Sequence, residues 1–210
     1  MIMGSQWGKD KVYVRALKEG YRSRAAFKLT EIQERHHIIR DSDNVVDLGA
    51  APGSWLQVVR EITAGTVVGV DLSYMPPLDG VTMFCGDFTD DEVLREVRAV
   101  IPQAGVVISD AAPKLSGQRS YDQARAIELG EHALAFATKI LKPGGNFIVK
   151  SFQGQDFNSL LADVRVYFLS VRTFRPQASR KGSTEIYIIA KNFIGLTMRE
   201  TPADVEDDET

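Results

Sequence analysis

The sequence is poor in cysteine and has no long apolar run. A single cysteine, Cys85, excludes a disulfide framework within the chain, as is usual for proteins of a reducing compartment. No uncharged apolar run approaches the ~20 residues of a membrane-spanning helix. The first residues are too few and too uncharged to form a secretory signal. We therefore expect a cytoplasmic protein with no membrane partner.

Signatures of metal and dinucleotide binding are also missing. The three histidines, His36, His37 and His132, do not form a metal-ligand set, so we expect no metal site. The Gly-x-Gly-x-x-Gly turn of dinucleotide-binding proteins is absent. An NAD-dependent dehydrogenase is therefore a weak alternative.

From Asn44 onward, short apolar segments alternate with helical patterns. The expected strands are residues 44–48, 66–71, 81–84, 105–109, 146–151, 169–174 and 185–190, and the expected helices are residues 54–63, 90–100, 120–141 and 156–167. Strand–helix–strand units of these lengths predict right-handed crossovers and a mostly parallel sheet covered by helices on both faces. The last two strands have no helix between them and should pair antiparallel at one edge. The expected fold is therefore α/β, with a seven-stranded sheet.

The chain divides into three expected parts. Apolar residues recur at helical spacing among charged residues over 7–39, and Ser23 is a candidate N-cap for a helix that starts near Arg24. We expect a basic helical extension over residues 1–40 and one core over residues 41–195. Residues 196–210 form an acidic tail that is too charged to bury.

Positive charge is concentrated in two segments, although the formal net charge is −3. Nine basic and four acidic residues lie between Lys9 and Arg40, and a second basic cluster spans residues 172–181. The acidic tail masks both clusters in the whole-chain sum. We expect them to contact nucleic-acid phosphates if the fold brings them to one face. The candidate residues are Lys9, Lys11, Arg22, Arg24, Arg175, Arg180 and Lys181.

A strand, a glycine turn and a helix start follow one another over residues 44–55. The sequence there is Asn-Val-Val-Asp-Leu-Gly-Ala-Ala-Pro-Gly-Ser-Trp. Its glycines, Gly49 and Gly53, allow close backbone approach, and free N–H groups at the helix start favour a ligand with negative charge or lone pairs. An ordinary strand-to-helix connection would explain the turn equally well.

Charged residues follow four of the expected strands. Ligands of open parallel sheets bind beyond the carboxyl ends of the strands. Asp71 is suited to a ribose diol and Asp87 to a second polar group of the same nucleoside, although each could simply cap a turn. With the glycine turn they describe an adenosine pocket. Lys150 follows apolar residues in an expected central strand, where a lysine is rare unless it is paired or functional. It could form a structural pair with Asp110 or act as a base.

Seven motifs together identify a family. They lie at residues 20–29 (Gly-Tyr-Arg-Ser-Arg-Ala-Ala-Phe-Lys-Leu), 46–55, 86–88, 109–113, 143–145, 149–154 and 183–187. On these motifs the chain resembles, from about Trp7 to Phe193, the FtsJ/RrmJ family of S-adenosylmethionine-dependent ribosomal RNA 2′-O-ribose methyltransferases. One departure is Ser54, which stands where bacterial members usually have a second glycine.

The resemblance implies a Rossmann-like methyltransferase fold, with S-adenosylmethionine as the cofactor and large-subunit ribosomal RNA as the partner. It implies 2′-O-methylation of a ribose in that RNA, of a uridine, by a monomer with Lys150 as the general base. The implied catalytic residues are Lys28, Asp110, Lys150 and Glu185, and the implied cofactor contacts are Gly49, Gly53, Trp55, Asp71, Asp87 and Asp110.

Other functions stay open at this point. The same catalytic set could methylate the 2′-oxygen of a transfer RNA or an mRNA cap. A ribosome-assembly factor could keep the fold without catalysis. A base N-methyltransferase is less consistent, because it predicts Asn/Asp-Pro-Pro-aromatic where this chain has Asp-Ala-Ala-Pro at residues 110–113.

Overall fold

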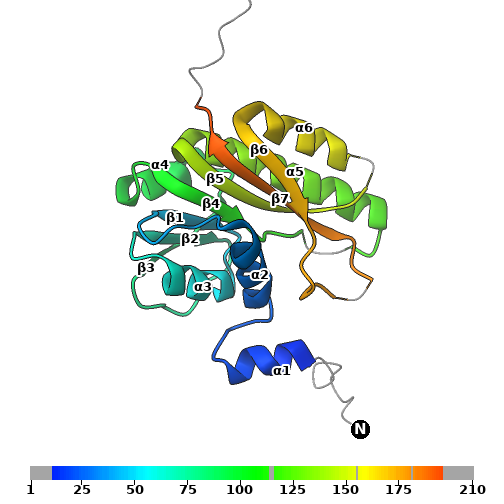
Figure 1. The fold of residues 1–210 in the computed structure, drawn as a ribbon, viewed down its shortest axis with the longest axis horizontal. Coiled ribbons are helices and arrows are strands. Elements are labelled where there is room, and N and C mark those ends of the chain that lie inside the picture. The colour runs from blue at the N-terminus through cyan, green and yellow to red at the C-terminus, as the bar shows by residue number, and fades with distance from the viewer. Residues whose placement is uncertain (1–10, 114–115, 155, 181, 196–210) are drawn as a thin grey trace, which may run out of the picture.

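The computed structural model describes residues 11–113, 116–154, 156–180 and 182–195. Its strands are β1 Val45–Leu48, β2 Val67–Asp71, β3 Val81–Cys85, β4 Ala104–Ser109, β5 Leu141–Phe152, β6 Phe168–Phe174 and β7 Glu185–Phe193. Its helices are α1 Lys11–Lys18, α2 Ala26–His36, α3 Ser54–Ile62, α4 Asp91–Val100, α5 Arg119–Ile140 and α6 Phe157–Tyr167. One seven-stranded sheet has the order β3-β2-β1-β4-β5-β7-β6 (Figure 1). The predicted fold class is confirmed.

The sheet is parallel from β3 to β5 and antiparallel on both sides of β7. All residues of β1 and β4 are buried, as expected for strands covered on both faces. β6 and β7 form the expected antiparallel pair, and β7 is its inner member. Because β7 runs against β5, Phe152 pairs with Glu185 and Lys150 with Tyr187. The start of β7 therefore lies beside the end of β5, where ligands bind in such sheets.

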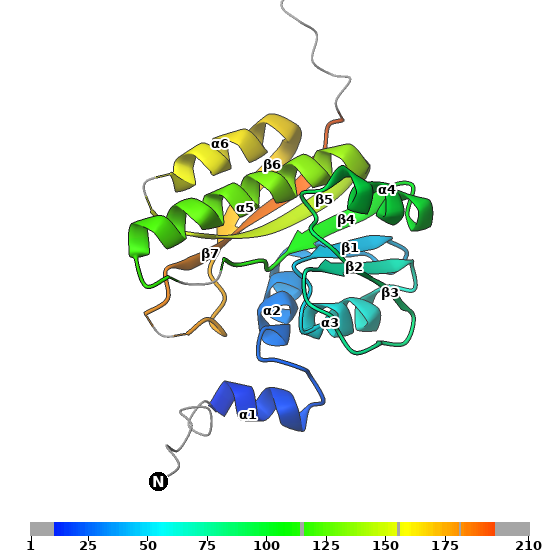
Figure 2. The ribbon, with the colours of Figure 1, turned by 180° about the vertical axis from the view of Figure 1, so that it is seen from behind.

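Helices cover the two faces of the sheet unequally. α4, α5 and α6 pack on one face in an apolar core that includes Val97, Phe136 and Leu160. α2 and α3 pack on the other face, with Leu29 and Trp55 in a second core. Figures 1 and 2 show α1 beyond α2, away from the sheet. The second core carries the elements that form the site.

The start of α2 differs from the prediction. The helix begins at Ala26, and Ser23 is not its N-cap. The hydroxyl of Ser23 instead accepts from the backbone N–H of Ala25 at 3.2 Å and shares a 2.8 Å hydrogen bond with the hydroxyl of Ser54. This bond ties the chain before α2 to the first residue of α3.

Some sequence predictions fall on residues that the structure does not describe. Lys9, Lys181 and the acidic tail over 196–210 are among them. The division into extension, core and tail stays a prediction. Within the described part of the chain, no helix has both the length and the apolar character needed to cross a membrane.

Candidate active site

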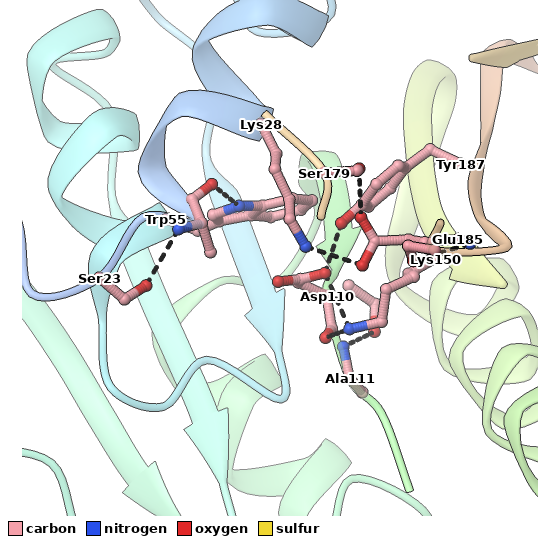
Figure 3. A network of polar contacts seen from close by, with 12 residues as sticks. Ser23, Lys28, Trp55, Asp110, Ala111, Lys150, Ser179, Glu185 and Tyr187 are labelled. Carbon is pink, nitrogen blue, oxygen red and sulfur yellow. Dashed lines mark hydrogen bonds and ion pairs between the residues drawn. The ribbon is translucent and has the colours of Figure 1, made fainter. Parts of the chain in front are cut away.

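Four charged side chains meet at the carboxyl end of the parallel strands (Figure 3). Lys28 comes from α2, Asp110 directly follows β4, Lys150 lies near the end of β5, and Glu185 begins β7. Nζ of Lys150 lies 2.9 Å from Oδ1 of Asp110, and Nζ of Lys28 lies 2.8 Å from Oε2 of Glu185. The structure thus brings together the four residues that the family resemblance named.

These charges are almost removed from water. The side chains of Lys28 and Glu185 are 12% and 11% exposed, and those of Lys150 and Asp110 are 7% and 18% exposed. Burying an ion costs several kcal/mol unless a partner compensates. Two cations and two anions compensate each other here, and the Lys150 ammonium also donates to the main-chain carbonyl of Asp110. Lys150 is therefore held in one position.

The carboxyl of Asp110 is kept ionised by its neighbours. Burial alone would raise its pKa, but the charges of Lys150 and Lys28 and a hydrogen bond from Tyr187 outweigh burial and hold the pKa below the ordinary value. The Tyr187 hydroxyl donates to Oδ1 of Asp110 at 2.6 Å. Asp110 therefore accepts from both Lys150 and Tyr187 as a carboxylate.

Tyr187 joins the cluster although the sequence reasoning gave it no role. Its side chain is fully buried, and its ring lies 5.9 Å from Nζ of Lys28 and 5.7 Å from the ring of Trp55. Burial, followed by the charges of Asp110 and Glu185, raises the pKa of Tyr187 well above its ordinary value, so the hydroxyl remains a donor. Because side chains two apart on a strand share a face, its place after Glu185 could have revealed it.

A second missed contact holds Glu185 from the β6–β7 loop. The hydroxyl of Ser179 donates to Oε1 of Glu185 at 2.7 Å (Figure 3). The loop itself is tied to α2, because the carboxylate of Glu31 accepts from the backbone N–H groups of Gln177 and Ala178 at 2.6 and 2.9 Å. Both oxygens of the Glu185 carboxylate are thus occupied, one by Lys28 and one by Ser179. No sequence signal marked this loop contact.

The glycine turn lies beside the charged cluster and needs both of its glycines. Gly49 and Gly53 have φ values of +73° and +98°. A Cβ on Gly49 would lie 2.6 Å from Cβ of Ala111, and one on Gly53 would lie 2.7 Å from Nη1 of Arg22. Side chains are excluded from both positions, which leaves the backbone of the turn open to a ligand.

The other predicted cofactor residues surround this turn. The carboxylate of Asp71 accepts from the backbone N–H groups of Ala51 and Ser73, at 2.9 and 2.8 Å. Asp87 follows β3, and its carboxylate accepts from the backbone N–H of Thr89 at 2.9 Å. Both side chains remain partly exposed on neighbouring strand ends. They can therefore still accept hydrogen bonds from a ligand.

Trp55 connects the turn to the charged cluster. Its indole Nε1 donates to the main-chain carbonyl of Ala25 at 2.8 Å, and its ring packs against Tyr187. The side chain is 2% exposed. This position holds the start of α2, and hence Lys28, against the glycine turn. Its predicted contact with a cofactor stays a prediction.

Asp47 is a buried carboxyl with no partner. Neither of its oxygens has a hydrogen bond from any described residue, and it lines a small cavity with Gly49, Trp55 and Asp110. Burial, followed by the charges of Asp110 and Asp71, raises the pKa of Asp47 well above its ordinary value. An unpaired buried carboxyl is costly, and a hydrogen-bond donor of a ligand that reaches this cavity would compensate for it.

Several predicted RNA-binding residues have other contacts. The guanidinium of Arg22 donates to the main-chain carbonyls of Pro52 and Pro77, at 3.1 and 2.7 Å. It therefore joins the glycine turn to the loop between β2 and β3. Arg24 donates to the carbonyl of Ala178. Arg175 is exposed and donates to Oε1 of Gln153 at 2.6 Å, and Lys11 and Arg180 are also exposed. Contact with RNA stays a prediction for all of them.

Comparisons with known proteins agree with this geometry. A family model described as FtsJ-like methyltransferase matches residues 21–193. Two relatives named Ribosomal RNA large subunit methyltransferase E come from Methanoculleus marisnigri and Methanosphaerula palustris. They are 64% identical over 197 residues and 61% identical over 193 residues, and the matches cover 92% of this chain in both cases and 96% and 95% of the relatives. A Plasmodium falciparum structure assigned as a ribosomal RNA methyltransferase has a TM-score of 0.76 and 28% identity, covering 83% of this chain and 100% of that chain.

We expect Asp47→Asn to be more stable than the native sequence in the ligand-free state, by a difference in free energy of unfolding that grows as the pH rises. A carboxyl with a raised pKa binds its proton more tightly in the folded state, so the stability of the native sequence falls as pH rises from 3.8 through the raised value. Each tenfold gain in proton affinity corresponds to about 1.4 kcal/mol. Urea unfolding at pH 5 and pH 8 measures this, with Asp163→Asn, an exposed position of α6, as the control. An equal difference at both pH values would contradict the prediction.

Tyr187→Phe should lower the free energy of unfolding by about 1–3 kcal/mol at neutral pH, because it leaves a buried carboxylate short of a donor. The folded-state pKa of Asp110 should rise. A depressed pKa adds stability above the ordinary value of 3.8, and this is lost as pH falls through the folded value. The deficit should therefore shrink in acid. Urea titrations from pH 7 to pH 3 test this, with exposed Tyr74→Phe as the control. A deficit that is independent of pH would count against it.

Proposed function

The chain belongs to the FtsJ-like methyltransferase family, and from this premise we propose that it methylates a ribose 2′-oxygen of large-subunit ribosomal RNA with S-adenosylmethionine. The observation that carries the proposal is the buried cluster of Lys28, Asp110, Lys150 and Glu185 beside the glycine turn. A binding protein would gain nothing from burying four ionised groups next to a ligand site. The names of the relatives favour the large-subunit RNA as the substrate.

The turn and its acids suit S-adenosylmethionine. This cofactor supplies a methyl group that is already activated on a sulfonium. Asp71 would accept from the ribose hydroxyls and Asp87 from the adenine amine, both at the ends of neighbouring strands. The unpaired carboxyl of Asp47 would accept from the ammonium group of the amino-acid part. Gly49 and Gly53 would let the backbone approach the ligand.

The charged cluster would align and deprotonate the ribose hydroxyl. Lys150, neutral in the reactive state after losing the proton that it carries in the ligand-free cluster, takes the 2′-OH proton, and the Lys28 ammonium stabilises the negative charge that develops on the oxygen. Asp110 fixes the position of Lys150, and Tyr187 fixes the Asp110 carboxylate. Glu185 fixes the position of Lys28. General base catalysis contributes about 10²–10⁴-fold in rate, and alignment several kcal/mol more.

The substrate must be RNA, because the proposed target is a ribose 2′-hydroxyl and DNA lacks this group. A transfer RNA or an mRNA cap could use the same four residues, and the large subunit is favoured over them only by the relatives. A uridine as the methylated nucleotide, a monomeric state and a cytoplasmic location stay predictions. A non-catalytic assembly factor would leave the buried lysines without a function.

Lys150→Ala should lower the rate of methyl transfer at least 10²-fold, because the proton acceptor is lost, and leave cofactor binding nearly unchanged. Radiolabelled S-adenosylmethionine, large subunits that lack the modification and mapping of 2′-O-methyl groups measure both reaction and position. Lys139→Ala, at an exposed ion pair with Asp91, is the matched control.

Each other outcome of this experiment has a clear meaning. Label on transfer RNA but not on subunits would keep the chemistry and reject the substrate. Cofactor binding without label on any RNA would favour the assembly factor. Full activity of Lys150→Ala would reject Lys150 as the base.

Arg22 joins the glycine turn to the loop between β2 and β3, so Arg22→Ala should release the turn and weaken S-adenosylmethionine binding about 10-fold in the absence of RNA. Charge-assisted hydrogen bonds are worth about 1.5–3 kcal/mol. Arg22→Lys should weaken binding to a similar extent, because an ammonium cannot span the two carbonyls of Pro52 and Pro77. Calorimetric titration measures both. Normal affinity of the lysine variant would show that only the charge of Arg22 matters.

A further inference from the structure

A second depression lies on the α2 side of the edge strand, away from the charged cluster. It has a volume of about 300 Å³ and is lined by Arg35, His36, His37, Ser170, Arg172, Ile189 and Lys191. Arg172 pairs with Ile189, four residues after Glu185 on β7, and Lys191 stands six residues after Glu185, so the depression extends from about 13 Å to about 20 Å from the cluster along the strand. We call it the distal groove.

The distal groove gathers positive charge without a carboxylate among its lining residues. Arg35 and Arg172 are exposed, and Lys191 is half-buried. The Lys191 ammonium donates to the main-chain carbonyl of His36 at 2.6 Å, at the C-terminal end of α2. A lysine needs only one of its three N–H groups for this bond. Three permanent cations thus face one volume.

Aromatic packing fixes the side of the groove formed by α2. The guanidinium of Arg35 lies 5.5 Å from the ring centroid of Phe174, and the ring of His36 meets the same ring edge-on at 5.1 Å. Nε2 of His36 is buried and has no hydrogen-bond partner in the described residues. The pKa of His36 is lowered by burial and, to a smaller extent, by the charges of Lys191, Arg172, Arg35 and His37. The positive field in the groove therefore favours an anion.

The distal groove continues toward the catalytic end of the sheet. Arg35 also lines a larger depression of about 520 Å³ with Glu31, Glu34, Phe174, Arg175 and Gln177. Both oxygens of Glu31 are already bonded to the backbone of the β6–β7 loop. That loop carries Ser179, which holds Glu185. Arg35 thus borders both depressions, and the exposed carboxylate of Glu34 lies in the second one.

We propose that the distal groove binds a backbone phosphate of the substrate RNA, about 13–20 Å from the charged cluster along β7, through Arg35, Arg172 and Lys191. The inference rests on the proposed function and adds a phosphate site to it. Phosphate contacts of this kind position the RNA and carry no base specificity. Arg35 and Arg172 each lie in one of the two basic segments of the sequence, and Lys191 lies in neither.

The test compares two double variants by RNA binding and by methylation. Arg35→Ala/Arg172→Ala removes two cations from the distal groove. Arg95→Ala/Arg165→Ala removes two exposed cations from α4 and α6, on the opposite face. Affinity for large-subunit RNA is measured from low to high salt, together with KM, kcat and S-adenosylmethionine affinity. Thermal unfolding confirms that each variant is folded.

We expect the groove variant to lose about tenfold or more in RNA affinity and to raise KM to the same extent, with kcat and cofactor affinity unchanged. The salt dependence of log affinity should become shallower by about 0.7–0.9, as expected for one lost phosphate contact. Arg172→Glu, which reverses one charge, should lower RNA affinity further than Arg172→Ala. The control variant should match the native chain in all of these quantities.

Other results overturn the inference and are distinct from failure of the proposed function. An unchanged RNA affinity and an unchanged salt slope in the groove variant would reject the phosphate site. A groove that binds an acidic protein surface instead of RNA would give this same result. A fall in kcat without a change in RNA affinity would show that the arginines act on the catalytic geometry. If the native chain methylates no RNA, the proposed function fails, while the binding measurements still decide the phosphate site.

Discussion

Mutual neutralisation of two buried ammonium groups and two buried carboxylates holds the site together. The four residues come from α2, the end of β4, the end of β5 and the start of β7, so no element contributes a complete pair by itself. An ion left alone at such a position costs several kcal/mol. The geometry that suits proton transfer is therefore the geometry that makes burial of these charges possible.

The sequence predicted much of the fold because its pattern is local. Apolar runs bounded by turns marked the seven strands, and the acids and lysine at strand ends marked the rim that binds ligands. Lys150 and Asp110 were marked by their places at strand ends, but Lys28 and Glu185 joined the proposed catalytic set only through the family resemblance, because nothing in their spacing indicates that α2 and β7 meet. The position of β7 between β5 and β6 depends on sheet order, which no local pattern encodes.

Residues that the sequence reasoning missed owe their roles to tertiary contacts. Asp47 appeared as one acid in an apolar strand, and only burial on all sides shows that it lacks a partner among the described residues. Charge counting also treated all arginines alike. Arg22 and Arg24 use their guanidinium groups on main-chain carbonyls, whereas Arg35 and Arg172 face a shared depression. The difference between an arginine that joins two loops and one that faces an open depression is invisible until the chain is folded.

The contact between Gly49 and Ala111 bears on how this protein can evolve. A Cβ at position 49 would meet not only the methyl of Ala111 but also its Cα, at 2.8 Å. Trimming the neighbour to glycine would remove the first clash and leave the second. A second substitution at position 111 therefore cannot compensate for a side chain at position 49. Such a side chain could be accommodated only if the ends of the two strands moved apart together.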